Sequence, residues 1–173
     1  MERSLDLARD DKRDARNDSG NGRDDMGGAP RKERIMKLLD DKLFEAIEVE
    51  AKASPRLRMN YDLRTQAMDE DPDWCDCSQR MLNVMMKDTV IPIHRHTETS
   101  ETVIVLRGSG NEVTYDSAGN ELARVTLKAG SACAAVQVPR NVYHTFIPHE
   151  NGTTIFEAKD RPYDPVKTEE FMG

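Results

Sequence analysis

The sequence predicts an all-β jelly-roll barrel that carries a short helix on its N-terminal side. Three observations favour this fold class. Short runs of β-forming residues recur between residues 80 and 159, turn residues separate them at close spacing, and no helical pattern interrupts them. About eight short strands without intervening helices are typical of an antiparallel sandwich or barrel. With 173 residues, the chain has room for one domain of ordinary size.

A charged segment precedes that domain. Residues 1–34 hold nine basic and nine acidic residues and show no apolar periodicity. Such a segment cannot bury enough surface to offset about 1–2 kcal/mol per residue of lost backbone freedom, so we expect disorder there. Residues 35–173 are then a single domain, and it carries the whole net charge of −7. That acidity argues against a nucleic acid or an anionic membrane as partner.

The chain reads as a cytoplasmic protein. No run approaches the ~20 apolar residues of a membrane helix, and charges occupy the N-terminal positions that a signal peptide would make apolar. Three cysteines without an export signal are expected to stay reduced. They are Cys75, Cys77 and Cys133. The first two are one residue apart, closer than the usual zinc spacing, so we do not expect a cysteine metal site.

The N-terminal part of the domain is predicted to form one helix and a polar connection. Asp40 or Asp41 is a good N-cap, and the apolar residues that follow keep helical spacing until Pro55, which predicts a helix over about 41–53. Residues 54–64 are too polar for a core strand. Their arginines, Arg56, Arg58 and Arg64, form either an anion-binding cluster or an ordinary solvated surface.

The barrel is expected to span about 80–159, followed by a C-terminal extension over 160–173. The predicted strands are 80–86, 90–96, 101–107, 111–115, 121–127, 132–138, 142–148 and 153–158. The strand over 101–107 is apolar on both faces, which favours a central position. The outer face of this strand is either covered by the helix or forms the contact of a homodimer. The sequence leaves both alternatives open.

Three of the four histidines sit in predicted strands. His94 and His96 are two residues apart, so both imidazoles leave the same face of their strand. If this strand pairs with the next one around the turn between them, Glu101 comes within about 4.5–5.5 Å of a histidine as a cross-strand neighbour. His144 then approaches from across the sandwich. His149, in a turn, is not expected to take part.

Three imidazoles and one carboxylate suit a divalent transition metal. The set leaves a site charge of about +1 and favours Fe, Mn, Ni, Zn or Cu over Mg or Ca. The sequence therefore predicts one such ion per chain, bound by His94, His96, Glu101 and His144. Four protein ligands around an octahedral ion leave two positions for water or substrate.

The histidine stretch resembles the cupin family. His94, His96, Glu101 and Gly108 match its first motif, H-x-H, three or four residues, Glu, six residues, Gly. The second motif, P-x-G-x-x-H, is matched in part by P-R-N-V-Y-H over 139–144, where Asn141 replaces the glycine. Asp88 and Pro148 also depart from the two patterns. Asparagine tolerates a left-handed turn better than most residues.

Within the cupins, the chain is similar to the WbuC-type metalloproteins associated with surface-polysaccharide gene clusters. The likeness covers about residues 35–166 and rests on M-K-L-L-D-D-K-L, A-S-P-R-L-R, Q-R-M-L-N, E-T-V-I-V-L-R-G and I-F-E-A-K-D-R-P-Y-D-P. Arg161 stands where that group usually has glycine. The resemblance implies a metal-binding cupin jelly roll, also called a double-stranded β-helix, with a link to polysaccharide or nucleotide-sugar metabolism.

The function expected from this site is binding or transformation of a small polar metabolite, such as a sugar or hydroxy acid. The residues expected to contact it are Arg56, Arg58, Arg80 and Asn83, since guanidinium groups match carboxylate and phosphate. Every histidine of the motif is committed to the metal, so the sequence offers no separate general base. The alternatives are a non-catalytic binding module, an iron-dependent dioxygenase and a structural metal with every position filled.

Overall fold

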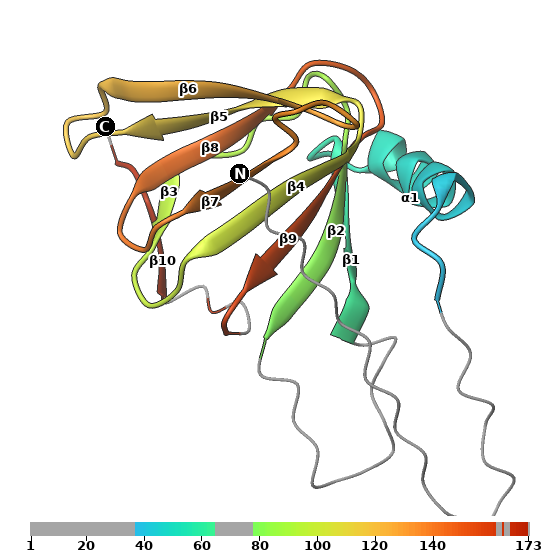
Figure 1. The fold of residues 1–173 in the computed structure, drawn as a ribbon, viewed down its shortest axis with the longest axis horizontal. Coiled ribbons are helices and arrows are strands. Elements are labelled where there is room, and N and C mark those ends of the chain that lie inside the picture. The colour runs from blue at the N-terminus through green and yellow to red at the C-terminus, as the bar shows by residue number, and fades with distance from the viewer. Residues whose placement is uncertain (1–36, 65–77, 162–163, 165–166, 173) are drawn as a thin grey trace, which may run out of the picture. The chain divides into compact units, whose positions relative to one another are not determined.

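Two five-stranded antiparallel sheets pack face to face in the computed structural model, which describes residues 37–64, 78–161, 164 and 167–172 (Figure 1). The first sheet has the order β1 (Arg58–Asp62), β2 (Gln79–Met85), β9 (Thr153–Lys159), β4 (Glu101–Arg107), β7 (Ala135–Val138). The second has the order β10 (Thr168–Glu170), β3 (His94–His96), β8 (Tyr143–Pro148), β5 (Ser109–Tyr115), β6 (Glu121–Lys128). The structure confirms the predicted all-β jelly roll. The charged tail over 1–34 and the pair Cys75 and Cys77 lie outside the described residues.

One helix, α1 (Asp41–Ala53), covers the outer face of β1 and β2 (Figure 1). The side chain of Asp40 caps it by accepting a hydrogen bond of 3.0 Å from the Leu43 amide. Its apolar stripe packs into one cluster with the outward side chains of the first sheet. The buried members of this cluster are Phe44, Ile47, Leu82 and Val84.

The structure has two strands that the sequence did not predict, β1 and β10. The segment before the barrel looked too polar for a core strand, but β1 is an edge strand with half-buried or exposed residues, so polar side chains are tolerated on its open side. Strand β10 has three residues and pairs with β3. It belongs to the stretch that was expected to be only a C-terminal extension.

The strand with the two histidines is shorter than predicted. The expected strand over 90–96 pairs only over His94–His96. Pro92 has no N–H to donate to a neighbouring strand, which favours an irregular start. Strand β4 has the predicted bounds and neighbours on both sides, and its Leu106 stays 37% exposed on the outer face.

The main core fills the space between the two sheets. Its buried members are Met85, Val103, Val105, Leu127, Phe146 and Ile155. Among the described residues, no helix is long and apolar enough to cross a bilayer.

Candidate metal centre and adjoining cavity

The three histidines lie on two paired strands of the second sheet. In β3, His94 and His96 leave the same face, as their spacing predicted, and β8 runs antiparallel beside them with His144 directly opposite His94. The turn that leads into β8 has Asn141 at φ 66°, the left-handed conformation expected for the residue in place of glycine. Its amide donates to the His96 carbonyl over 2.8 Å, which ties the turn to the histidine strand.

Glu101 reaches the histidines by a different route from the one expected. The sequence argument placed it on a strand paired with the histidine strand and brought His144 from across the sandwich. That pairing was wrong, because β3 and β4 belong to different sheets. His144 is the cross-strand neighbour, and Glu101 is the residue that crosses the space between the sheets.

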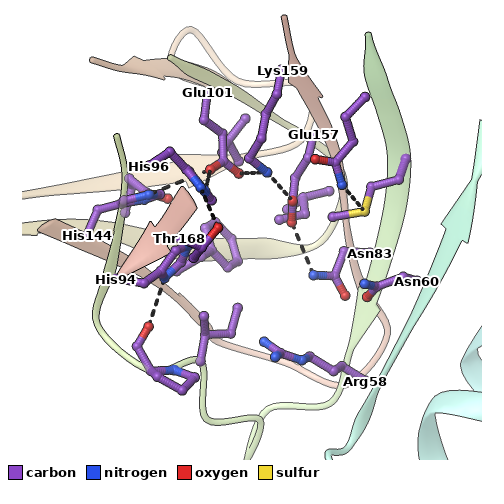
Figure 2. Close-up of a pocket in the computed structure, with 18 of the residues that line it drawn as sticks. Arg58, Asn60, Asn83, His94, His96, Glu101, His144, Glu157, Lys159 and Thr168 are labelled. Atoms are coloured by element: carbon purple, nitrogen blue, oxygen red, sulfur yellow. Dashed lines mark hydrogen bonds and ion pairs between the residues drawn. The ribbon is translucent and has the colours of Figure 1, made fainter. Parts of the chain in front are cut away.

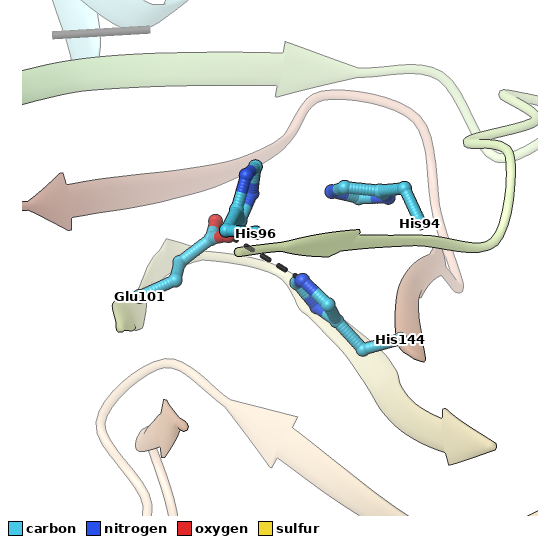
Figure 3. A group of neighbouring side chains, drawn as sticks. All are labelled: His94, His96, Glu101 and His144. Atoms are coloured by element: carbon cyan, nitrogen blue, oxygen red, sulfur yellow. Dashed lines mark ion pairs between the residues drawn. The ribbon is translucent and has the colours of Figure 1, made fainter. Parts of the chain in front are cut away.

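These four side chains converge on one point. One ligand atom from each of His94, His96, Glu101 and His144 can be chosen so that all lie within 4.8 Å of one another. Oε2 of Glu101 is 3.0 Å from Nε2 of His96 and 3.6 Å from Nε2 of His144. Figure 3 shows the rings and the carboxylate turned toward a common centre. The group could hold a metal ion.

Each of the three imidazoles has its Nδ1 atom engaged by another group. Nδ1 of His94 lies 2.9 Å from the Pro92 carbonyl oxygen, and that of His96 lies 3.2 Å from the Thr168 hydroxyl. Nδ1 of His144 lies 2.7 Å from the Glu112 carboxylate. Such contacts fix the ring orientation and tautomer of metal-binding histidines. They leave Nε2 of each ring for coordination.

Two atoms at this point test whether the residues fit a metal ion. Nε2 of His96 and Oε2 of Glu101 are buried and lie 3.0 Å apart, and in the described part of the chain neither atom has a hydrogen-bond partner beyond this contact. Buried polar atoms that lack further partners cost free energy, and coordination to a cation would compensate both atoms at once. Three imidazole nitrogens and one carboxylate oxygen also suit a divalent transition metal. The residues fit the ion.

The surroundings of His94 and Glu101 favour the protonation states that coordination needs. For His144, burial lowers the pKa, but the hydrogen bond to Glu112 and the charge of Glu101 raise it above its ordinary value. Burial, reinforced by the neighbouring His144, lowers the pKa of His94 to about 4, so its ring is neutral near pH 7. Burial alone would raise the pKa of Glu101, but the Lys159 ammonium and the hydrogen bond to His96 lower it. Glu101 is therefore a carboxylate and His94 a neutral ligand at ordinary pH.

Lys159 and Glu157 on β9 extend the cluster with a buried ion pair. Nζ of Lys159 lies 3.2 Å from Oε1 of Glu101 and 3.3 Å from Oε2 of Glu157. Because Lys159 occupies Oε1, Oε2 is the oxygen of Glu101 that remains for the metal. Sequence reasoning missed this pair. The available signal was two charged residues at strand spacing on a strand with buried neighbours on both sides.

A cavity of about 520 Å³ adjoins the cluster. That is within the usual range for small-molecule sites. The four predicted metal ligands line it, and so do Lys159 and Glu157. In Figure 2, Lys159 and Glu157 lie between the histidine cluster and the side chains of Asn83 and Asn60.

Strands β1 and β2 supply the other wall of this cavity. Alternate residues face it, since side chains on a strand alternate between faces: even-numbered residues from the β1 side and odd-numbered residues from β2. They are Arg56, Arg58, Asn60, Asp62 and Arg64, and Gln79, Met81 and Asn83. Asn60 and Asn83 are cross-strand partners.

Three of the four residues expected to contact a ligand lie at this wall. They are Arg56, Arg58 and Asn83. Arg80 is not among the described residues that line the cavity. It is three positions from Asn83, so the pleat of β2 turns it to the opposite face, the one that carries Leu82 and packs on α1. The structure therefore does not bring Arg80 and Asn83 together at this cavity.

The fold is similar to that of several solved structures. CapF, bound to the inhibitor 3-isopropenyl-tropolone, matches with a TM-score of 0.50 and 16% identity over 58% of this chain and 30% of CapF. Another structure describes CapF as a capsular polysaccharide assembling protein from Staphylococcus aureus. Pumpkin seed globulin matches with a TM-score of 0.50 and 12% identity, over 68% of this chain and 29% of the globulin.

A third similar structure is ChmJ, a 3'-monoepimerase from Streptomyces bikiniensis, with a TM-score of 0.49 and 14% identity over 65% of this chain and 68% of ChmJ. The chain thus spans less than a third of the length of CapF and of the globulin. At these identities the likeness shows the fold alone. A comparison with curated proteins found no match.

Together, the two packed sheets and the His/Glu cluster between them define a protein of the cupin fold with a site that could bind a metal. More particularly, the chain belongs to the family described as "Domain of unknown function (DUF6016)", whose model matches residues 39–127. This stretch contains three of the four clustered residues and the wall formed by β1 and β2.

Proposed function

We propose that this chain is a metal-dependent cupin that binds a small polar metabolite and acts on it at the His94, His96, Glu101 and His144 site. One observation carries the proposal: the four ligand atoms converge at the wall of a 520 Å³ cavity. A structural metal with every position filled needs no adjoining cavity of this size. The site therefore favours a ligand that enters beside the ion.

The side chains of the cluster have distinct roles in this proposal. The three Nε2 atoms and Oε2 of Glu101 hold one divalent transition metal ion, and Lys159 restricts Glu101 to a single coordinating oxygen. When bound there, such an ion supplies a Lewis acid that can polarise a carbonyl or hold neighbouring hydroxyl oxygens. The protein supplies the orientation of the ligand through the polar wall formed by β1 and β2.

Glu157 supplies the acid–base group that sequence reasoning could not find. It lines the cavity without belonging to the four proposed ligands, and burial raises its pKa above the ordinary value for a glutamate. A carboxyl group with a raised pKa can give or take a proton nearer to neutral pH. This observation favours catalysis over the alternative of a non-catalytic binding module.

The finer assignment follows the sequence resemblance. The similarity to WbuC-type cupins supports a sugar or a nucleotide sugar of surface-polysaccharide metabolism as the metabolite. The alternative of an iron-dependent dioxygenase uses the same kind of ligands. The two differ in a measurable way, because only the dioxygenase consumes oxygen.

The test begins with the metal. Protein purified without added metal should contain about one transition-metal ion per chain by mass spectrometry, as a single ligand cluster implies. Thermal-shift screening of sugars and hydroxy acids should then give stabilisation that depends on the metal. Oxygen uptake with Fe(II) and a stabilising ligand would instead support the dioxygenase. Protein that neither carries nor takes up a transition metal would contradict the proposal.

A further inference from the structure

The β2 side of the cavity holds buried hydrogen-bond acceptors for which the described residues supply no donor. Oε1 of Gln79 and Oδ1 of Asn83 are both without a hydrogen-bond partner in the described part of the chain, and the two residues are only 5% and 4% exposed. The amide nitrogen of Asn83 donates to Oε1 of Glu157 over 3.1 Å, which fixes its oxygen as the other atom. Metal binding would compensate His96 and Glu101, but not these two amides.

An acceptor without a partner selects for a ligand that donates. Leaving such an atom unpaired in a buried site costs about 1–3 kcal/mol, and a hydroxyl or N–H of a ligand would recover part of that cost. The amide nitrogen of Gln79 is 3.3 Å from the Met81 sulfur, a weak acceptor, so this side chain is also poorly satisfied within the protein. The buried part of this wall therefore suits a body rich in hydroxyl groups.

The outer part of the same wall carries arginine side chains. Arg56 is exposed and Arg58 half-buried, and both line the cavity. Arg64 lies there too, but its guanidinium is bound to Asp62, with Nη2 of Arg64 2.7 Å from Oδ2. Asp62 offsets the charge of Arg64, and Arg56 and Arg58 bring two further guanidinium groups to this part of the wall. Guanidinium groups bind carboxylates and phosphates through paired hydrogen bonds.

We infer that the wall formed by β1 and β2 is a second subsite for an anionic polyol, with Gln79 and Asn83 accepting from its hydroxyl groups and Arg56 and Arg58 binding its anionic group. The ligand class is a sugar phosphate or a sugar acid, which share this chemistry. The inference rests on the proposed function, in which the metal end of the cavity holds the other end of the same ligand. The inference adds the orientation of the ligand in the cavity: its anionic group lies at the end away from the metal.

Titration calorimetry on metal-loaded protein tests the class of ligand. The probes are D-glucose 1-phosphate, D-gluconate, D-glucose and inorganic phosphate. We expect at least one of the first two to bind about tenfold more tightly than either glucose or phosphate, because only they fill both parts of the wall. Preference for the phosphate or for the carboxylate probe identifies the source of the anion. Equal affinity for all four probes would overturn the inference.

Variants then test the residues. Arg56→Gln and Arg58→Gln should each weaken binding of the preferred anionic probe about tenfold, as for the loss of a charge-assisted hydrogen bond, and leave glucose binding unchanged. Gln79→Met should weaken both the anionic probe and glucose several-fold. The matched control is Arg124→Gln on the exposed strand β6, which removes the same charge outside the cavity. It should change the binding of neither the anionic probe nor glucose. Unchanged binding in both Arg56→Gln and Arg58→Gln would refute the assignment.

The metal content of each variant separates this inference from the proposed function. All of these variants should keep the metal content of the unmodified protein. If the unmodified protein binds no metal, the proposed function fails, and the same titrations on that protein still test the subsite. If it binds metal but no anionic polyol, the proposed function stands and the subsite is refuted.

Discussion

Strand β2 has two buried faces whose chemistry differs. On the face toward α1, Leu82 and Val84 pack against Phe44 and Ile47. On the face toward the cavity, Gln79 and Asn83 are nearly as well buried, but their amide oxygens have no donor among the described residues. Apolar contacts stabilise the fold, whereas a buried acceptor without a partner costs stability. One strand thus carries residues that hold the fold together and residues better explained by a ligand.

The largest expected effect is loss of the metal. His94→Ala and His144→Ala each remove one proposed ligand, so metal content should fall from about one ion per chain to a small fraction of that. Mass spectrometry of the purified variants measures it. The control is His149→Ala, an exposed histidine outside the cluster, which should keep its metal. Full metal content in both ligand variants would refute the assignment.

A large-to-small substitution on the helix-facing side of β2 should lower the stability of the fold. Leu82 is 0% exposed and belongs to the cluster under α1. Leu82→Ala removes buried methyl groups and leaves a cavity, which should lower the free energy of unfolding by about 2–5 kcal/mol. Urea denaturation measures the loss. The folded variant should still bind metal, and a variant that lost the metal while keeping its stability would contradict the division between the two faces.

An apolar substitution on the cavity-facing side of β2 should raise the stability of the fold. Gln79→Met replaces an amide that has an unpartnered oxygen with an apolar side chain of similar length. We expect the free energy of unfolding to rise by about 1 kcal/mol while ligand binding weakens. The control, Gln137→Met on the exposed part of β7, should stay within about 0.5 kcal/mol. A clear loss of stability in Gln79→Met would show that this amide supports the fold.

The smallest effect concerns the contact between α1 and the barrel. Oε2 of Glu48 is 2.7 Å from Nη2 of Arg107, and Oε1 is 2.9 Å from Nζ of Lys52. The hydrogen bond from Lys52, with the charge of Arg107, lowers the pKa of Glu48 below 4.5. This stabilisation is complete above pH 4.5 and is lost as the pH falls through the lower, folded-state value.

Glu48→Gln should therefore cost about 0.5 kcal/mol near pH 7 and weaken the decrease in stability below pH 4.5. Urea denaturation at several pH values measures both effects. Glu45→Gln, an exposed change on the same helix, serves as the control. If Glu48→Gln and the unmodified protein had the same pH profile of stability, the ion pairs of Glu48 would contribute nothing to the free energy of unfolding.

Local patterns predicted the parts of the fold that depend on local spacing. The helix cap at Asp40, the strand over 101–107 and the shared face of His94 and His96 all follow from neighbours in sequence. The motif also identified the four clustered residues. These features need no knowledge of which strands pair.

Strand pairing is where sequence reasoning failed. It joined the strands of His96 and Glu101 because they follow one another, but the chain crosses from one sheet to the other between them. It rejected β1 because polar residues looked unsuited to a core, although an edge strand beside a cavity needs them. It grouped Arg80 with Asn83 by proximity in sequence, although the pleat separates them.

The pairing of β3 with β10 has a consequence for how the site is assembled during synthesis. All four clustered residues have been made once the chain reaches His144. However, the hydroxyl beside Nδ1 of His96 belongs to Thr168, and β10, the strand that pairs with β3, is made after all four of these residues. A nascent chain that ends before Thr168 has every proposed ligand but lacks the hydroxyl and the paired strand that fix the position of His96. We expect tight metal uptake to require synthesis of β10, so that chains that stop before it compete poorly for the ion.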